Sequence, residues 1–253
     1  MDPVSIAPVA AAPASRTFGL GEVLGASLAL FGRELPRIAA FALLLESPVL
    51  LVLAAIGPEL EGAAPDPRRR IVDLVSNVLF VFTTAGVTHL ALEALAGRRA
   101  RLRDVLGAAI LKGRKVFVAG FLSSAAWALG LLLLVIPGLV LAAGYFVAVP
   151  AAVAEDRTTG SGALARSWEL SRGRRVLMLG VFLLSILGIF GGLFLLATIV
   201  YALEAAETPS LVLVSALQTV LVTFLPVSAT VAYHRLRREK EGEDPAELGA
   251  VFE

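Results

Sequence analysis

The sequence contains no cysteine, which excludes a disulfide framework, a thiolate-bound metal and a cysteine nucleophile. Charged residues are also scarce: they make up 17% of the chain, against about 25% in ordinary soluble domains. Hydrophobic residues reach 57% and the mean hydropathy is +0.83, which is more apolar material than one water-soluble core can bury. The composition therefore excludes a soluble globular enzyme and indicates an integral membrane protein.

The chain as a whole has no excess of one charge sign, because 22 Lys and Arg residues face 21 Asp and Glu residues. A nucleic-acid partner is therefore not expected. The first 15 residues carry no Lys or Arg, and prolines at positions 3, 8 and 13 interrupt any helix, so this segment does not look like a signal peptide. Residues 1–16 are predicted to form a flexible cytoplasmic tail.

Six apolar segments are long enough, or nearly so, to cross about 30 Å of hydrocarbon as helices. A barrel strand would alternate apolar and polar residues, whereas LGLLLLVIPGLVLAAG is apolar throughout. We therefore predict an all-α, polytopic membrane helical bundle over residues 17–234, followed by a charged cytoplasmic tail, 235–253. The six predicted spans are Leu35–Ile56, Ile71–Ala96, Val116–Ile136, Leu139–Ala154, Val176–Leu203 and Leu211–Tyr233.

The distribution of cations along the chain predicts the orientation of the spans. Nineteen Lys and Arg residues lie in the segments on one side of the predicted membrane, and only Arg68, Arg69 and Arg70 lie on the other. The positive-inside rule places the nineteen, and both termini, in the cytoplasm. Trp168 and Tyr233 fall at predicted interfaces, as in an aromatic belt, but Trp127 falls in mid-span.

A pattern recurs three times before the odd-numbered spans, each time ending in Gly-Arg: Gly21–Arg33, Leu102–Arg114 and Ser161–Arg174. The third segment is clearly two-faced on a helical projection and the first is two-faced as well, so we predict short amphipathic helices in the headgroup plane. The chain can then be read as a threefold internal repeat of an interfacial helix and a hairpin. The alternative is that any positive-inside protein has such arginine-ended links.

Ionisable and polar groups inside the predicted spans are candidate site residues because the bilayer penalises them. Glu46 lies in the middle of the first span, just before Ser47-Pro48, which could open the helix. Counted in residues from the cytoplasmic ends of the first two spans, Glu46 lies at a membrane depth similar to that of His89. We therefore expect the two side chains to pair across the hairpin. Such a pair could form a site for a proton or a ligand. Alternatively it could be a polar contact that fixes the packing of the two helices, and we favour this second interpretation. The second span contributes Asp73, Asn77, Thr84, Thr88, His89 and Glu93.

Motifs for catalysis or cofactor binding are absent from the sequence. His89 and Glu93 do not complete an H-E-x-x-H zinc motif, no G-x-S-x-G surrounds a serine, and no phosphate-binding glycine loop occurs. We predict no enzyme activity, no cofactor and no metal. Gly188 and Gly192 form a G-x-x-x-G, which we assign to close packing of helices within the chain.

The stretch LVIPGLVLAAGYFVAVPAAVAEDRTTGSGALARSWELSRGRR, from Leu134 to Arg175, resembles the membrane domain attached to some bacterial glycerophosphoryl diester phosphodiesterases, and stand-alone relatives of unknown function. The opening FGLGEVLGASLALFGRELPRI is similar to that family as well. The resemblance implies a six-helix module of the bacterial plasma membrane. It does not carry over the phosphodiesterase activity, because the spans and links use nearly all of this chain. The shared features are Pro137-Gly138, Pro150, Glu155, Ala163-Leu164, Ser167-Trp168, Leu170 and Gly173.

Around the third interfacial segment we expect Ser161 to cap the helix, Trp168 to anchor it, and Glu155 to meet Arg166 or Arg172. The main hypothesis is a non-enzymatic membrane module that scaffolds partners or lipids, with anionic headgroups, a membrane protein or a second copy as partner. The alternative is a small-solute or proton-coupled transporter that uses Glu46 and the polar stripe of the second span, with candidate helix breaks at Ser47-Pro48, Pro150 and Leu225-Pro226. The candidate interfacial contacts are Glu155, Arg166, Ser167, Trp168 and Arg172.

Overall fold

The computed structural model describes residues 18–60, 67–156, 158–202 and 208–242. These residues form helices and no strand, which confirms the all-α prediction. The predicted tail 1–16 and residues 243–253 lie outside the described residues. In chain order the helices are α1 (Leu20–Leu60), α2 (Pro67–Leu95), α3 (Leu102–Leu133), α4 (Val135–Tyr145), α5 (Ala148–Ala154), α6 (Gly162–Ser171), α7 (Arg175–Ala202), α8 (Thr208–Val222) and α9 (Phe224–Glu241).

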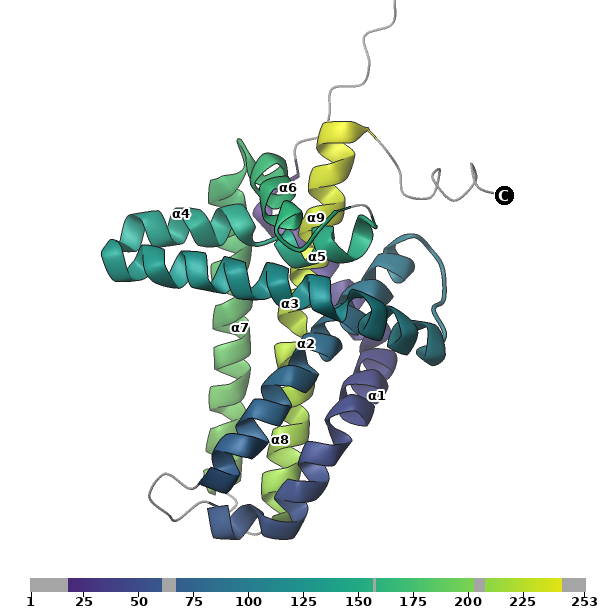
Figure 1. Cartoon of the computed structure of the whole chain (residues 1–253), viewed down its shortest axis with the longest axis vertical. Helices are drawn as coiled ribbons and strands as arrows, with labels where there is room; N and C mark the ends of the chain where they lie inside the picture. The colour runs from purple at the N-terminus through teal and green to yellow at the C-terminus, as the bar shows by residue number, and fades with distance from the viewer. Residues whose placement is uncertain (1–17, 61–66, 157, 203–207, 243–253) are drawn as a thin grey trace, which may run out of the picture.

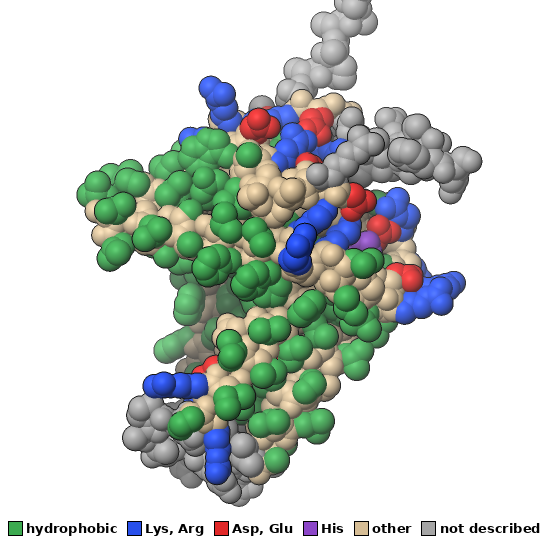
Figure 2. All heavy atoms as spheres, viewed as in Figure 1, with side chains coloured by type: hydrophobic (Ala, Val, Ile, Leu, Met, Phe, Trp, Pro, Cys, Tyr) green, Lys and Arg blue, Asp and Glu red, His purple; other side chains and the backbone are tan. Residues whose placement is uncertain are grey.

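Among the described residues, six helical stretches are long and apolar enough to cross a membrane: Leu20–Ala55, Pro67–Leu95, Leu102–Leu133, Val135–Ala154, Arg175–Val200 and Val212–Glu241. Large apolar side chains point outward over much of the surface, and Figure 2 shows them covering the α3–α4 hairpin. Soluble monomers rarely expose apolar patches of more than a few hundred Å². The protein is therefore an integral membrane protein, solvated by lipid along these helices.

The arrangement of the six differs from a simple parallel bundle. Helices α1, α2, α7, α8 and α9 follow the long axis of the molecule, whereas the hairpin of α3 and α4 lies across them (Figure 1). The crossing is near the end that carries α6 and the last turns of α9, which we call the arginine-rich end. The last turns of α1 and the first turn of α2, which carries Arg68–Arg70, lie at the opposite end (Figure 1). Apolar length predicted these helices but not their direction.

Prolines mark most of the breaks between helices. Pro137, Pro150 and Pro226 are each the third residue of their helix, α4, α5 and α9 respectively. The first four N–H groups of a helix have no partner within it, so proline is tolerated there although it interrupts a helix interior. The expected breaks near Pro150 and Pro226 are thus present. The expected opening at Ser47-Pro48 is not, because α1 runs through it without interruption.

The backbones of α3 and α4 lie very close together where the chain reverses in the crossing hairpin. Leu134 is extended between α3 and α4, so the chain reverses three residues before Pro137. A Cβ atom added at Gly138 would lie only 2.5 Å from the backbone nitrogen of Leu131, so only glycine fits there. Within the predicted G-x-x-x-G of α7, Gly192 packs on Leu221 of α8, whereas nothing lies within 4 Å of a Cβ at Gly188.

The three Gly-Arg segments do not fold alike. The first two are the opening turns of the long helices α1 and α3, so the predicted separate interfacial helices are wrong there. Only the third forms a helix of its own, α6, and Gly173 follows it with φ of +83°, a left-handed conformation that ends a helix. At the other end of the chain, residues 235–241 continue α9 rather than beginning a tail.

The best-packed part of the interior lies where α3 and α5 meet α1, α2 and α9. Phe41, Val87, Val105, Val147 and Val231 are nearly inaccessible and belong to one cluster. A Cβ atom at Gly86 would lie 2.3 Å from the Phe41 ring, so α1 and α2 approach closely at that point. This packing holds the crossing hairpin against the other helices.

We expect the tip of the hairpin not to reach the membrane surface beside Arg68–Arg70. Because the chain has no cysteine, single cysteines report on sidedness without background. In sealed vesicles, a membrane-impermeant maleimide that labels Arg70→Cys from one side should leave Leu134→Cys unlabelled from that side. Equal labelling of the two variants from that side would show that α3 and α4 cross the membrane completely.

Candidate functional site

Glu46 is a buried carboxylate in the middle of α1, only 4% exposed. Ser76 of α2 donates a hydrogen bond from its Oγ to Glu46 Oε2 at 3.4 Å. The expected pairing with His89 is wrong, because His89 lies 13 residues beyond Ser76 and therefore about 20 Å further along α2. Phe41 of α1 packs on Gly86 of α2, and in this antiparallel pair Glu46 and His89 lie on opposite sides of that contact, whereas the depth count placed them level.

Glu46 lies in the wall of a polar cleft of about 420 Å³ between α1, α2 and α8. Part of the predicted stripe of α2 lies here, namely Asp73 and Asn77, and Asn77 Nδ2 donates to the Asp73 carbonyl at 2.7 Å. Helix α8 adds polar residues that our sequence analysis missed, although their i, i+3, i+4 spacing places them on one helix face. They are Ser215, Gln218 and Thr219.

The charges of this cleft are of mixed sign. Two acidic side chains, Glu46 and Asp73, share the wall with one basic side chain, Arg69. A buried carboxylate among membrane-spanning helices is unfavourable unless a cation, a proton or hydrogen bonds compensate it. The cleft is therefore suited to a group that carries a positive charge, and Arg69 adds a position for a negative one.

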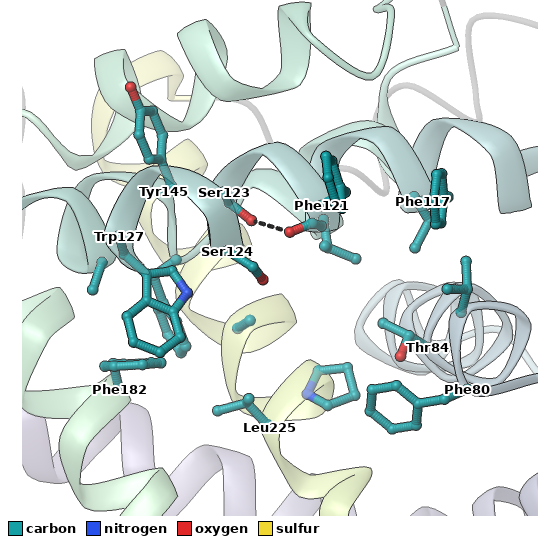
Figure 3. A pocket seen from close by; sticks show the side chains of 18 of the residues that line it. Phe80, Thr84, Phe117, Phe121, Ser123, Ser124, Trp127, Tyr145, Phe182 and Leu225 are labelled. Carbon is teal, nitrogen blue, oxygen red and sulfur yellow. Dashed lines mark hydrogen bonds between the residues drawn. The ribbon is translucent and has the colours of Figure 1, made fainter. Parts of the chain in front are cut away.

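A second, larger cavity of about 520 Å³ lies beneath the α3–α4 hairpin. Its walls come from α2, α3, α4, α5, α7 and α9 and are mainly aromatic and aliphatic, as Figure 3 shows. Thr84, the next member of the predicted stripe, lines it, and its Oγ1 is buried without a hydrogen-bond partner. Thr88 is buried further along α2, also without a partner for Oγ1.

Trp127 has a clear position in this cavity. It extends from α3 toward Phe182 of α7 in Figure 3, and both rings line the wall. This explains why Trp127 did not fit an aromatic belt: its ring occupies a space between helices. Asn77 and Phe80 line both the polar cleft and the apolar cavity, so the two spaces adjoin along α2.

The remaining predicted residues of α2 belong to the arginine-rich end. Arg98 contacts both Glu93 carboxylate oxygens, at 2.8 and 2.9 Å, and these contacts raise the pKa of Arg98 above its ordinary value. Arg33 of α1 donates to the Ala94 carbonyl at 3.3 Å. His89, half-buried one helical turn before Glu93, lies at this end as well. His89 and Glu93 are therefore separated from the Glu46 cleft.

Glu155, at the end of α5, is the centre of an ion-pair network. It accepts hydrogen bonds from Arg166 Nε at 2.8 Å and from Tyr233 OH at 3.0 Å, which confirms the expected Glu155–Arg166 contact. Arg166 also pairs with Glu241 of α9. Burial lowers the pKa of Arg166, but the hydrogen bonds to Glu155 and Glu241 outweigh it, so that the pKa is raised. The network joins α5, α6 and α9.

Helix α6 is fastened to α4 through Gly144. Ser167 and Ser171 donate to its carbonyl at 2.8 and 3.2 Å, and a Cβ atom there would lie 2.3 Å from the Trp168 ring. The Arg175 guanidinium lies 3.6 Å from the centroid of the Trp168 ring, a cation–π contact. Ser167 and Trp168 therefore hold helices together within the protein.

Two further predictions around α6 concern Ser161 as its cap and Arg172 as an interfacial contact. Ser161 does not cap the helix through its side chain; Thr159 Oγ1 instead accepts a hydrogen bond from the Gly162 amide at 3.0 Å. Arg172 is the most exposed member of the predicted interfacial set, and its carbonyl accepts from Lys240 Nζ at 2.9 Å. Of that set, only Arg172 presents its side chain mainly to the surroundings.

Comparison of the chain with protein-family models, curated proteins and solved structures finds no match. Within the described ranges, no group of three or more His, Asp or Glu side chains is placed to hold a metal ion. Function is therefore inferred from the cleft, the cavity and the distribution of charge.

We expect Glu155→Gln to lower the free energy of unfolding by about 1–3 kcal/mol, because it removes the charged acceptor shared by Arg166 and Tyr233. Thermal unfolding in detergent micelles measures this. Glu22→Gln is the matched control, since that carboxylate is 64% exposed and its ion pair with Arg235 spans 3.5 Å; it should change stability by no more than about 0.5 kcal/mol. Equal effects of the two substitutions would show that the network does not hold α5, α6 and α9 together.

Proposed function

We propose that this protein is a non-enzymatic integral membrane module that binds anionic lipid headgroups at its arginine-rich end. The observation that supports this is the surface formed by the α2–α3 connection and the start of α3. Exposed cations and exposed apolar side chains lie next to one another there, which is the composition of a membrane-interface segment. The cations are Arg99, Arg101 and Arg103, and the apolar residues are Leu102, Leu106 and Ile110.

The energetics favour lipid headgroups over internal partners for these cations. Arg103 pairs with Asp104 at 3.3 Å, but both side chains are more than half exposed, and such surface pairs contribute about 0–1 kcal/mol. A cation near an anionic membrane surface contributes about 1 kcal/mol. Several arginines on one surface therefore bind an anionic leaflet cooperatively with the apolar residues beside them.

The family resemblance and the distribution of cations favour a bacterial plasma membrane as the location of the protein, with both termini in the cytoplasm. In that setting the arginine-rich end contacts the cytoplasmic leaflet, where it would also meet a partner protein or a second copy.

We expect Arg99→Gln/Arg101→Gln to weaken phosphatidylglycerol binding by about 30-fold, since each cation contributes about 1 kcal/mol. Native mass spectrometry of the detergent-solubilised protein at several lipid concentrations measures the affinity. Arg68→Gln/Arg70→Gln removes the same charge from the opposite end of the molecule and should change binding much less. Equal losses in the two double variants would mean that only net charge matters, and an unchanged affinity of Arg99→Gln/Arg101→Gln would refute the proposal.

A second candidate function is proton-coupled or small-solute transport, which is favoured by one observation: Glu46 is buried and lines a cleft with polar walls. On this hypothesis the wild-type protein in proteoliposomes should carry a proton flux, detected by an internal pH dye, that Glu46→Gln abolishes. Glu22→Gln, on the same helix, should leave the flux intact. No flux from the wild type, or equal flux from Glu46→Gln, would exclude proton transport through this cleft.

A further inference from the structure

The polar cleft and the apolar cavity adjoin along one face of α2. Asp73, Asn77, Phe80 and Thr84 follow one another at intervals of four, three and four residues, which is the spacing of a single helix face. Asp73 lines the cleft, Thr84 lines the cavity, and Asn77 and Phe80 line both. A ligand lying along this face would meet polar groups at one end and hydrocarbon-like groups at the other.

We propose that the cleft and the cavity together form a binding site for a phospholipid with an amine-bearing headgroup. The headgroup, with its ammonium and its phosphate, lies in the cleft among Glu46, Asp73 and Arg69, and an acyl chain enters the cavity beneath the α3–α4 hairpin. This goes beyond the proposed headgroup binding at the arginine-rich end, because the lipid is held between helices and at the other end of α2. The ligand class is a zwitterionic aminophospholipid.

The lengths agree with this placement. From Arg69 to Phe80 the helix rises about 17 Å over 11 residues, and half of the hydrocarbon core is about 15 Å thick. A lipid whose headgroup lies level with Arg69 therefore has its chain ends beside Phe80, where the cleft meets the cavity. Both volumes, about 420 and about 520 Å³, are in the usual range for small-molecule sites.

The charges select the headgroup. Two carboxylates and one guanidinium line the cleft, so an amine together with a phosphate finds a partner for each of its charges. An anionic headgroup such as phosphatidylglycerol has a phosphate but no cation, and would leave Glu46 buried without a counter-charge. The site should therefore prefer phosphatidylethanolamine over phosphatidylglycerol.

The walls of the cavity favour an acyl chain over a polar solute. Phe117, Phe121, Trp127 and Phe182 supply aromatic surface (Figure 3), and burying a polar molecule against it without hydrogen bonds is unfavourable. Phe117 and Phe121 are more than half exposed, so the cavity is open at its side. A chain can enter laterally from the surrounding lipid.

Trp127 provides a reporter within the proposed site. The chain has two tryptophans, and the other, Trp168, packs on Gly144 at the arginine-rich end. The protein is reconstituted in vesicles that contain equal mole fractions of phosphatidylethanolamine and phosphatidylglycerol, with bromine on the chains of one lipid or the other. The Trp127 contribution is the difference in quenching between the wild type and Trp127→Phe.

We expect brominated phosphatidylethanolamine to quench Trp127 at least threefold more than brominated phosphatidylglycerol does. Glu46→Gln should remove this preference, and Asp73→Asn, on a different helix, should reduce it. Glu22→Gln should keep it, and so should Arg99→Gln/Arg101→Gln, which separates this proposal from the one for the arginine-rich end. Circular dichroism and gel filtration identify any variant that does not fold.

Three results would overturn the proposal. The first is equal quenching of wild-type Trp127 by the two lipids. The second is a preference that survives in both Glu46→Gln and Asp73→Asn. The third is a preference that Glu22→Gln removes equally, since the effect would then come from the overall charge rather than from the cleft.

Discussion

The position of the α3–α4 hairpin depends on the ion-pair network around Glu155 and on the contacts of Gly144. Glu155 joins the end of α5 to Arg166 of α6 and Tyr233 of α9, and the Gly144 carbonyl accepts from two hydroxyls of α6. These contacts are partly buried, where hydrogen bonds to charged groups contribute more than at the surface. They hold the hairpin across the other helices, and the cavity beneath it exists only because of that crossing.

Local signals in the sequence predicted much of the fold. Apolar length predicted the membrane helices, proline predicted the breaks before Pro150 and Pro226, and charge complementarity predicted the Glu155–Arg166 pair. The direction of the hairpin could not be predicted in this way, because apolar length is the same for a helix that crosses the bilayer and for one that lies along it. The crossing instead depends on contacts between residues distant in sequence, such as Ser167 with Gly144.

The candidate site was predicted in part. The polar stripe of α2 was identified from its spacing, and the structure distributes it over a cleft, a cavity and the helix end. The pairing of Glu46 with His89 was wrong, because counting residues from the ends of two spans does not give the register of the helix pair, and the Phe41–Gly86 contact lies between the two side chains. The polar face of α8 was missed because its three residues carry no charge, and mid-span Trp127 had no interpretation until the cavity was seen.

The crossing hairpin also gives the protein unequal ends. Figure 1 shows the molecule much broader near the arginine-rich end than at the end where α1 finishes and α2 starts. In a bilayer such a wedge displaces more lipid from one leaflet than from the other. Many copies in one region of the membrane would therefore expand the leaflet at the arginine-rich end relative to the other leaflet. The membrane would then bend so that the expanded leaflet is on the convex side.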